Sequence, residues 1–148
     1  MISGVILTPL KIIADDRGAV MHVLRRDSEV FRGFGEAYFS TVKPGGIKAW
    51  KRQKQMTLNV ATPIGKVRFV LYDDRPGSAT RGMIDEILLG PDNYQLLTVP
   101  PGIWNGFCAE ADTDSLVINV TDTPYNAEDV DRLPSDTTAI PYTWPLRD

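Results

Sequence analysis

Long apolar runs, paired cysteines and a surplus of positive charge are all missing from this chain of 148 residues. No stretch approaches the roughly 20 apolar residues of a membrane-spanning helix, so we expect no membrane insertion. A net charge of −3 argues against general nucleic-acid binding, which needs a basic surface. The single cysteine, Cys108, cannot form an internal disulfide. The segment Met1–Gly4 lacks the features of a signal peptide, and we expect a cytoplasmic protein.

Histidine is nearly absent too, because His22 is the only one in the chain. Transition-metal sites draw mainly on imidazole and thiolate ligands, and one histidine with one cysteine cannot build the usual set. The sequence therefore predicts no metal site and no other cofactor. His22 lies in the apolar run Val20–Leu24, where a lone histidine is more often a hydrogen-bonded wall residue than a ligand.

Helical periodicity is also missing. Short β-rich runs recur about every 10–12 residues between clusters of Gly, Pro, Asp and Asn, a spacing typical of sandwiches and barrels. We therefore predict an all-β fold, a double-stranded β-helix or jelly-roll barrel of the cupin type, as one domain over residues 1–148. One helical turn is expected at Ala127–Val130. The expected strands are Gly4–Ile13, Val20–Leu24, Gly35–Val42, Ile47–Trp50, Met56–Thr62, Lys66–Tyr72, Met83–Leu89, Tyr94–Val99 and Ser115–Thr121.

Two segments carry a family resemblance. One is Tyr72–Gly82, with Asp-Asp-Arg at its start, and the other is Val99–Phe107, which reads Val-Pro-Pro-Gly-Ile-Trp-Asn-Gly-Phe. In this order and spacing they resemble the dTDP-4-dehydrorhamnose 3,5-epimerase family, cupins that invert centres on 4-keto-6-deoxy nucleotide sugars. The resemblance covers Asp15–Trp144. It implies an isomerase of deoxysugar and O-antigen lipopolysaccharide biosynthesis, a dTDP-linked 4-keto sugar as substrate, and a homodimer that exchanges amino-terminal strands.

The position of the catalytic base differs from the family pattern. The resemblance places a His-x-His pair, whose first member is the base, where this chain has Lys51 and Gln53. Alternation along a strand would point both side chains into the barrel. Gln53 cannot take a proton, whereas Lys51 could if neighbouring cations lowered its pKa. Two interpretations stay open: Lys51 is an alternative base, or the base has been lost at Gln53.

A cluster of cations surrounds this position, formed by Lys48, Arg52 and Lys54. Three interpretations stay open. The cations bind a diphosphate, or they belong to a solvated edge strand whose lysines protect it from aggregation. In the third, they lower the pKa of Lys51 so that it acts as the base. The resemblance adds Arg17, which matches a phosphate-binding arginine that often acts across a dimer interface. It also places Lys48 where the family has a second phosphate-binding arginine. We therefore expect these cations to bind the substrate's phosphates.

Several further positions receive a role from the resemblance. Tyr125 falls near the family's catalytic tyrosine, and Asp136 matches a carboxylate that orients the base. His22 occupies the place of a glutamate near the base, and Asn105 that of a histidine. Trp104 would stack on a sugar or base, or would simply fill the mouth of the barrel. The turn after Tyr72 is expected to be structural, because Asp, Pro and Gly favour turns.

The leading hypothesis is a nucleotide-sugar 3- or 5-epimerase, or one that acts at both centres. Epimerisation next to a ketone needs a base on one face of the sugar, an acid on the other, and a group that stabilises the enolate. Two alternatives stay open. One is a nucleotide-sugar-binding cupin without epimerase activity, and the other is an active-site variant with its base replaced at Gln53.

Overall fold

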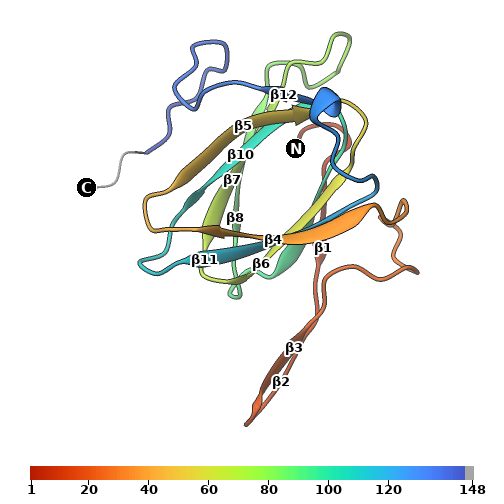
Figure 1. Cartoon of the computed structure of the whole chain (residues 1–148), viewed down its shortest axis with the longest axis vertical. Coiled ribbons are helices and arrows are strands. Elements are labelled where there is room, and N and C mark those ends of the chain that lie inside the picture. Colours follow the sequence, from red (N-terminus) through yellow and green to blue (C-terminus); the bar gives the residue numbers. More distant parts are fainter. Residues whose placement is uncertain (146–148) are drawn as a thin grey trace.

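The structure, a computed structural model, describes residues 1–145, which fold almost entirely into β-strands (Figure 1). The predicted helical turn is confirmed as one 3₁₀ helix, η1 (Ala127–Asp129). No helix in this part of the chain has the length and apolarity needed to cross a bilayer. The strands, in chain order, are β1 (Ile6–Pro9), β2 (Ile12–Asp15), β3 (Gly18–Met21), β4 (Glu36–Val42), β5 (Ile47–Gln53), β6 (Leu58–Ile64), β7 (Val67–Asp73), β8 (Ile84–Leu89), β9 (Gln95–Val99), β10 (Ile103–Ala109), β11 (Ser115–Thr121) and β12 (Val130–Arg132).

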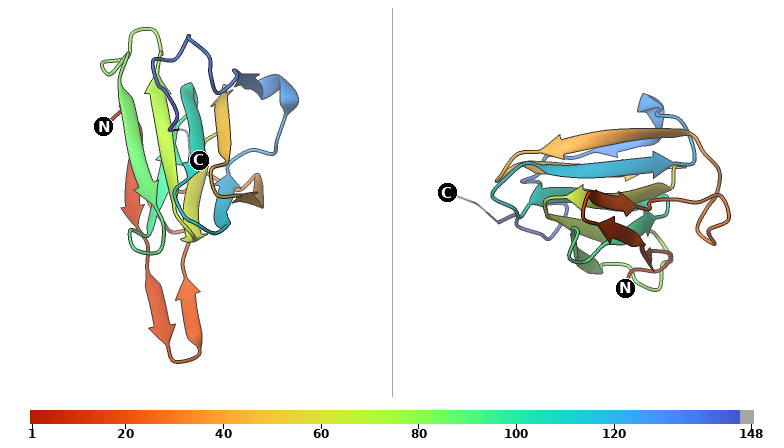
Figure 2. Two further views of the ribbon diagram at one scale, coloured as in Figure 1. Left: turned by 90° about the vertical axis from the view of Figure 1, so that its left-hand side faces the viewer. Right: turned by 90° about the horizontal axis from the view of Figure 1, so that it is seen from below.

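Two five-stranded antiparallel sheets stack on each other (Figure 2). The β4 sheet has the order β1-β9-β6-β11-β4, and the β5 sheet has the order β12-β5-β10-β7-β8. Strands β2 and β3 pair only with each other and form a hairpin that projects from the body (Figure 1). The predicted all-β, cupin-type jelly roll is confirmed. Its two sheets, however, stay separate within residues 1–145 and do not close into the continuous barrel that the sequence predicted.

The hydrophobic core fills the space between the two sheets. Alternate residues point inward, among them Leu58 and Val60 on β6 and Leu71 on β7, and all three are buried. Full burial of one such side chain stabilises the fold by about 1.5–3 kcal/mol. The core therefore holds the sheets face to face.

Two further apolar clusters cover the outer faces. On the β5 sheet, Ile140 and Trp144 of the carboxy-terminal segment pack on Trp50, whose ring centroid lies 5.0 Å from that of Trp144. On the β4 sheet, Val30 packs with Leu96. Strands with two covered faces can be apolar along their whole length. This burial explains why apolar residues in β6 and β7 do not simply alternate with polar ones.

The predicted strands are observed with shifted bounds, and three differences matter. The expected strand Gly4–Ile13 is divided into β1 and β2, because the chain leaves the β4 sheet after Pro9 to enter the hairpin. The expected strand Val20–Leu24 ends at Met21, since the residues that follow pack on the outer face of the β4 sheet. Strands β10 and β12 were not predicted. The Asn-Gly step in β10 resembles a turn, but pairing with both β5 and β7 makes it a central strand.

The turn after β7 is built around the carboxylate of Asp73, whose side chain is fully buried. This carboxylate accepts hydrogen bonds from Arg75 Nε at 2.9 Å, and from Ser78 Oγ and Thr80 Oγ1 at 2.7 Å each. Arg75 also donates to the carbonyl of Ser3. The bonds from Arg75, followed by those from the two hydroxyls, hold the pKa of Asp73 far below its usual range. The expected structural role of this motif is confirmed.

We expect Asp73→Asn to lower the free energy of unfolding at neutral pH by about 2–3 kcal/mol, because charge-assisted hydrogen bonds are lost. The contribution of Asp73 is present above the ordinary carboxyl pKa of about 3.9 and is lost as pH falls toward the depressed folded value. The difference between the two proteins should therefore shrink below about pH 4. Urea unfolding at several pH values measures it, with Asp92→Asn, at an exposed turn position, as the control. An equal loss in both variants would contradict this account.

Candidate functional site

A cavity of about 130 Å³, here called the inner cavity, lies between the two sheets. Its polar wall comes from four strands, and its apolar floor belongs to the hydrophobic core. The polar residues are Tyr38 and Ser40 on β4, Lys48, Lys51 and Gln53 on β5, Asn105 on β10, and Asn119 on β11. The apolar residues are Leu58, Val60, Phe69, Phe107 and Val117. A site with a few polar groups over an apolar floor is typical of small-molecule binding.

An extra residue in β5 decides which side chains reach the inner cavity. Asn105 pairs with Lys51 and Gly106 pairs with Ala49, so Trp50 has no partner in β10. Such a bulge shifts the alternation of side chains by one residue. Lys48 therefore lies on the same face as Lys51, while the Trp50 side chain is buried on the outer face.

Gly106 is required at this bulge because the two backbones approach closely. A Cβ atom at Gly106 would lie 2.5 Å from the Cβ of Ala49, a distance that real Cβ contacts do not reach. The Asn-Gly-Phe segment of the family resemblance thus has a steric reason in this structure.

Gln53 and Asn105 form a buried pair in the wall of the inner cavity, with only 8% and 6% of their surfaces exposed. Asn105 Nδ2 donates to Gln53 Oε1 at 2.9 Å and to the carbonyl of Lys51 at 3.0 Å. This bond fixes the orientation of the Gln53 carboxamide, whose N–H groups can donate to a ligand. Asn105 holds the backbone of Lys51 as well.

Lys51 is exposed along β5 but lines the inner cavity, and its neighbours are positive. Burial lowers the pKa of its ammonium, and the charges of Arg132 and Lys48 lower it further. Among the residues that the structure describes, no carboxylate forms an ion pair with Lys51. Lys48 Nζ donates to Ser40 Oγ at 2.8 Å. The inner cavity therefore holds two amines and no compensating carboxylate from the described chain.

Arg52 and Lys54 lie outside the inner cavity. Arg52 stacks on the ring of Trp104 at 4.5 Å and pairs with Asp131 at 2.8 Å and Asp74 at 3.1 Å. Lys54 lies 3.6 Å from the same Asp131. Trp104 donates its Nε1–H to Asp74 at 3.0 Å and is buried in the outer cluster. Of the four cations expected near the base position or its phosphates, the structure brings only Lys48 next to Lys51.

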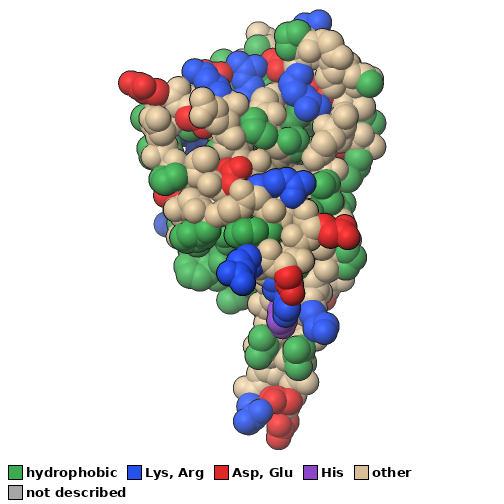
Figure 3. All heavy atoms as spheres, turned by 90° about the vertical axis from the view of Figure 1, so that its right-hand side faces the viewer, with side chains coloured by type: hydrophobic (Ala, Val, Ile, Leu, Met, Phe, Trp, Pro, Cys, Tyr) green, Lys and Arg blue, Asp and Glu red, His purple; other side chains and the backbone are tan. Residues whose placement is uncertain are grey.

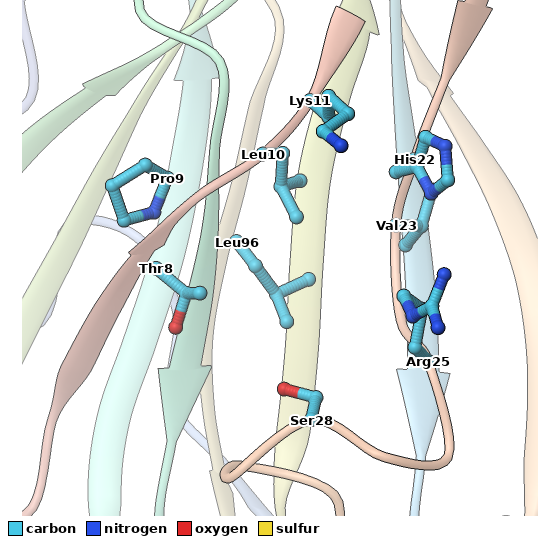
Figure 4. A pocket seen from close by; sticks show the side chains of 9 residues that line it. All are labelled: Thr8, Pro9, Leu10, Lys11, His22, Val23, Arg25, Ser28 and Leu96. Carbon is cyan, nitrogen blue, oxygen red and sulfur yellow. The ribbon is translucent and has the colours of Figure 1, made fainter.

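Arg17 and His22 lie on the side of the projecting hairpin. Arg17 is at its tip, where it pairs with Asp15 at 2.7 Å. His22 lines a second cavity of about 440 Å³ at the base of the hairpin, together with Lys11 and Arg25 (Figure 4). Figure 3 shows that basic side chains gather around the single histidine there. The structure therefore does not bring either residue to the inner cavity of the same chain.

Tyr125 and Asp136 also do not line the inner cavity. Tyr125 is 55% exposed and contacts Arg132, whose Nη2 is 3.5 Å from the tyrosine hydroxyl. Asp136 lines a surface hollow beside Ile47 and Tyr142, on the outer face of the β5 sheet. Both positions follow from the path of the segment after β11, which leaves the β4 sheet and joins the edge of the β5 sheet through β12 (Figure 1).

The wall contributed by the β4 sheet was not predicted from the sequence. Tyr38 and Ser40 lie on β4, and Asn119 on β11 donates its Nδ2–H to the Tyr38 hydroxyl at 2.8 Å. The alternation of side chains along each strand could have indicated these residues. Tyr38 and Ser40 are separated by one residue and so lie on one face of their strand, and Asn119 interrupts an otherwise apolar strand. Within residues 1–145, no group of three His, Cys, Asp or Glu side chains could hold a metal ion.

Comparisons with known proteins agree with this fold. The family model of dTDP-4-dehydrorhamnose 3,5-epimerase matches residues 1–148. The spore coat polysaccharide biosynthesis protein SpsL of Bacillus subtilis is 34% identical over 146 residues, which are 97% of each chain. A dTDP sugar isomerase of Desulfovibrio desulfuricans is 46% identical, with a TM-score of 0.95 over 97% of this chain and 92% of its own.

A more distant structure shares the fold. The dTDP-6-deoxy-D-glucose-3,5-epimerase of Legionella pneumophila, solved in complex with dTDP-4-keto-L-rhamnose, has a TM-score of 0.84 at 21% identity. The match covers 97% of this chain and 80% of that one.

We expect Lys48→Met and Arg132→Met each to raise the pKa of Lys51, because each removes a positive charge that disfavours its ammonium form. Carbon-13 NMR of the reductively methylated protein follows the titration, and the signal lost in Lys51→Arg identifies the residue. Lys54→Met serves as the control and should leave the pKa of Lys51 unchanged, since Lys54 is paired with Asp131. An unchanged pKa in both test variants would contradict the assignment.

Proposed function

We propose a function for this chain from its family, because it belongs to the dTDP-4-dehydrorhamnose 3,5-epimerase family. In this proposal the chain is an isomerase that inverts a carbon next to the ketone of a nucleotide-linked 4-keto-6-deoxy sugar. One observation supports the proposal above the rest: Lys51, with a lowered pKa, stands in a polar cavity between the sheets. The similarity of the chain to a dTDP sugar isomerase supports dTDP as the nucleotide to which the sugar is linked. The cytoplasmic location expected from the sequence belongs to the same proposal.

Lys51 is the base in this mechanism. An amine with a depressed pKa is neutral in a larger fraction of molecules near pH 7, and only the neutral amine accepts a proton. Lys51 removes the proton from the carbon next to the ketone, and the electron pair moves onto the ketone oxygen to form the enolate. The negative charge of the enolate is stabilised by donors already held in place. The Lys48 ammonium, anchored on Ser40, and the amide N–H of Gln53 are suited to this role.

Gln53 is an orienting residue in this proposal and not the trace of a lost base. Its carboxamide oxygen accepts a hydrogen bond from Asn105, and both residues are buried. An amide has no protonation step near neutral pH, so it supplies only hydrogen bonds. The residue equivalent to the family's base is then Lys51, and Gln53 acts on the ketone oxygen.

Deuterium wash-in from D2O into a panel of dTDP- and other NDP-4-keto-6-deoxy sugars, read by mass spectrometry, tests the function. The unmodified chain should exchange the proton next to the ketone, and Lys51→Ala should lose about 10²- to 10⁴-fold in rate, the usual contribution of a general base. Lys54→Ala, which changes a paired lysine on the outer face, should retain the rate.

Two other outcomes would contradict the proposal. If the unmodified chain binds dTDP but exchanges no proton, the chain is a binding protein without epimerase activity. If exchange is absent from the unmodified chain and appears only in Gln53→His, the base has been lost at that position and Lys51 is not its replacement.

The projecting hairpin supports a homodimer. Ile13 and Val20 on its strands are 54% and 60% exposed, and an isolated two-stranded hairpin is only marginally stable in water. Its free edges can pair with a sheet of a second copy. Exchange of hairpins between two copies, which the family resemblance implies, would carry Arg17 away from its own body and toward the nucleotide of the partner.

We expect the double variant Ile13→Asp, Val20→Asp to be monomeric by light scattering and to bind dTDP more weakly in calorimetry. Two charges on the hairpin would oppose its burial, and the separated copies would no longer share Arg17. Arg17→Ala should weaken dTDP binding and reduce its salt dependence, because one charge-assisted contact to phosphate is lost. Ile64→Asp, an exposed position on the body, is the control. Unchanged dTDP affinity in Arg17→Ala would contradict this role.

A further inference from the structure

Tyr38 is a proton-bearing group in the inner cavity that the sequence motifs do not assign. It lies on β4, at the edge of the β4 sheet, whereas Lys51 lies on β5 in the opposite sheet. The two sheets are stacked (Figure 2), and side chains of both β4 and β5 line the inner cavity between them. A sugar ring in that space would have Lys51 on one face and Tyr38 on the other.

The hydrogen bond from Asn119 orients the tyrosine hydroxyl. Asn119 Nδ2 donates to Tyr38 Oη at 2.8 Å, so the oxygen acts as acceptor in this contact. The proton of the hydroxyl is not used in the contact and is available to a ligand. Asn119 is only 6% exposed, and its Oδ1 atom is buried with no hydrogen-bond partner among the described residues. The pair thus offers a donor and an acceptor that the protein itself leaves unused.

The environment keeps Tyr38 in its neutral, donating form. Burial raises the pKa of its hydroxyl, the hydrogen bond from Asn119 lowers it in part, and the nearby charge of Glu36 raises it again, with a net increase. A neutral phenol near pH 7 is the form that can act as a general acid.

We propose that Tyr38 is the catalytic acid that returns a proton to the sugar on the face opposite Lys51, with Asn119 as its positioning residue. The inference rests on the epimerase function proposed above. After Lys51 has taken the proton, the enolate's electron pair forms a new bond between the same carbon and the proton of the Tyr38 hydroxyl, and the ketone re-forms. The phenolate then regains a proton from solvent as the Lys51 ammonium releases one, so no electrons are gained or lost.

Tyr125 is the competing candidate, because the family resemblance assigned the catalytic tyrosine to its vicinity. The side chains of Tyr125 and Tyr38 are 55% and 43% exposed, so exposure does not separate them. Tyr125 contacts Arg132 and does not line the inner cavity. Tyr38 does line it. The two tyrosines therefore form a matched pair for substitution, in which each loses only a hydroxyl group.

The test compares proton exchange with inversion in D2O, for the unmodified chain, Tyr38→Phe and Tyr125→Phe. In Tyr38→Phe, Lys51 still removes the proton and returns deuterium on the same face, so the substrate becomes deuterated without inversion. We expect formation of the epimer to fall by about 10²-fold or more, the usual contribution of a general acid, while substrate exchange continues. Tyr125→Phe should behave as the unmodified chain does. Mass spectrometry reads the deuterium, and proton NMR coupling constants read the configuration.

Asn119→Asp provides a second measurement that does not remove the tyrosine. A carboxylate only accepts hydrogen bonds, so the Tyr38 hydroxyl must turn its proton toward residue 119 and away from the sugar. We expect the same separation of exchange from inversion, with dTDP affinity retained. A merely structural role would instead lower exchange and inversion together.

The outcomes separate this inference from the proposed function. If Tyr38→Phe keeps both exchange and inversion, the role of Tyr38 is overturned and the epimerase function still stands. The same conclusion follows if exchange and inversion are lost in Tyr125→Phe instead. Neither exchange nor inversion in the unmodified chain would overturn the proposed function and the role of Tyr38 with it.

Discussion

The extra residue in β5 is the constraint on which the site depends. Trp50 has no partner in β10, and Gly106 allows the close approach of the two strands at this point because it has no side chain. The bulge places Lys48 on the same face as Lys51, and it buries Trp50 under the carboxy-terminal segment. One irregularity thus connects the charge of the inner cavity with the packing on the opposite face of the sheet.

The same strand separates two kinds of cation. Arg52 lies on the outer face, where Asp131 and Asp74 neutralise it and Trp104 covers it. Lys51, its neighbour in the chain, faces the inner cavity beside Lys48 and has no carboxylate in ion-pair range among the described residues. Paired charges stabilise a fold only modestly, whereas an unpaired amine with a lowered pKa in a cavity is the kind of group that functional sites use, which is why we propose Lys51 as the base. The distinction comes from the alternation of side chains and not from the number of charges.

Much of the fold was predictable because it rests on local patterns. The β-rich runs and turn residues indicated an all-β jelly roll, and the Asp73 turn was recognised from residues that bond within one loop. Strand β10 was missed because its Asn-Gly step is locally typical of a turn, and only pairing on both sides makes it a strand. The site was harder to predict for the same reason. Tyr38 and Asn119 are far apart in the chain, and the pairing of β4 with β11 brings them together.

The sequence by itself determined the fold class, the family and the replacement of the expected histidine pair by Lys51 and Gln53, because each of these is carried by residue types in a fixed order along the chain. The tertiary structure alone decided which of the cations share a cavity, that Gln53 is held by Asn105, and that a tyrosine of the other sheet faces the same space. The physical reason is that a bulge or a strand pairing changes the face on which a side chain lies, while the sequence around it stays the same.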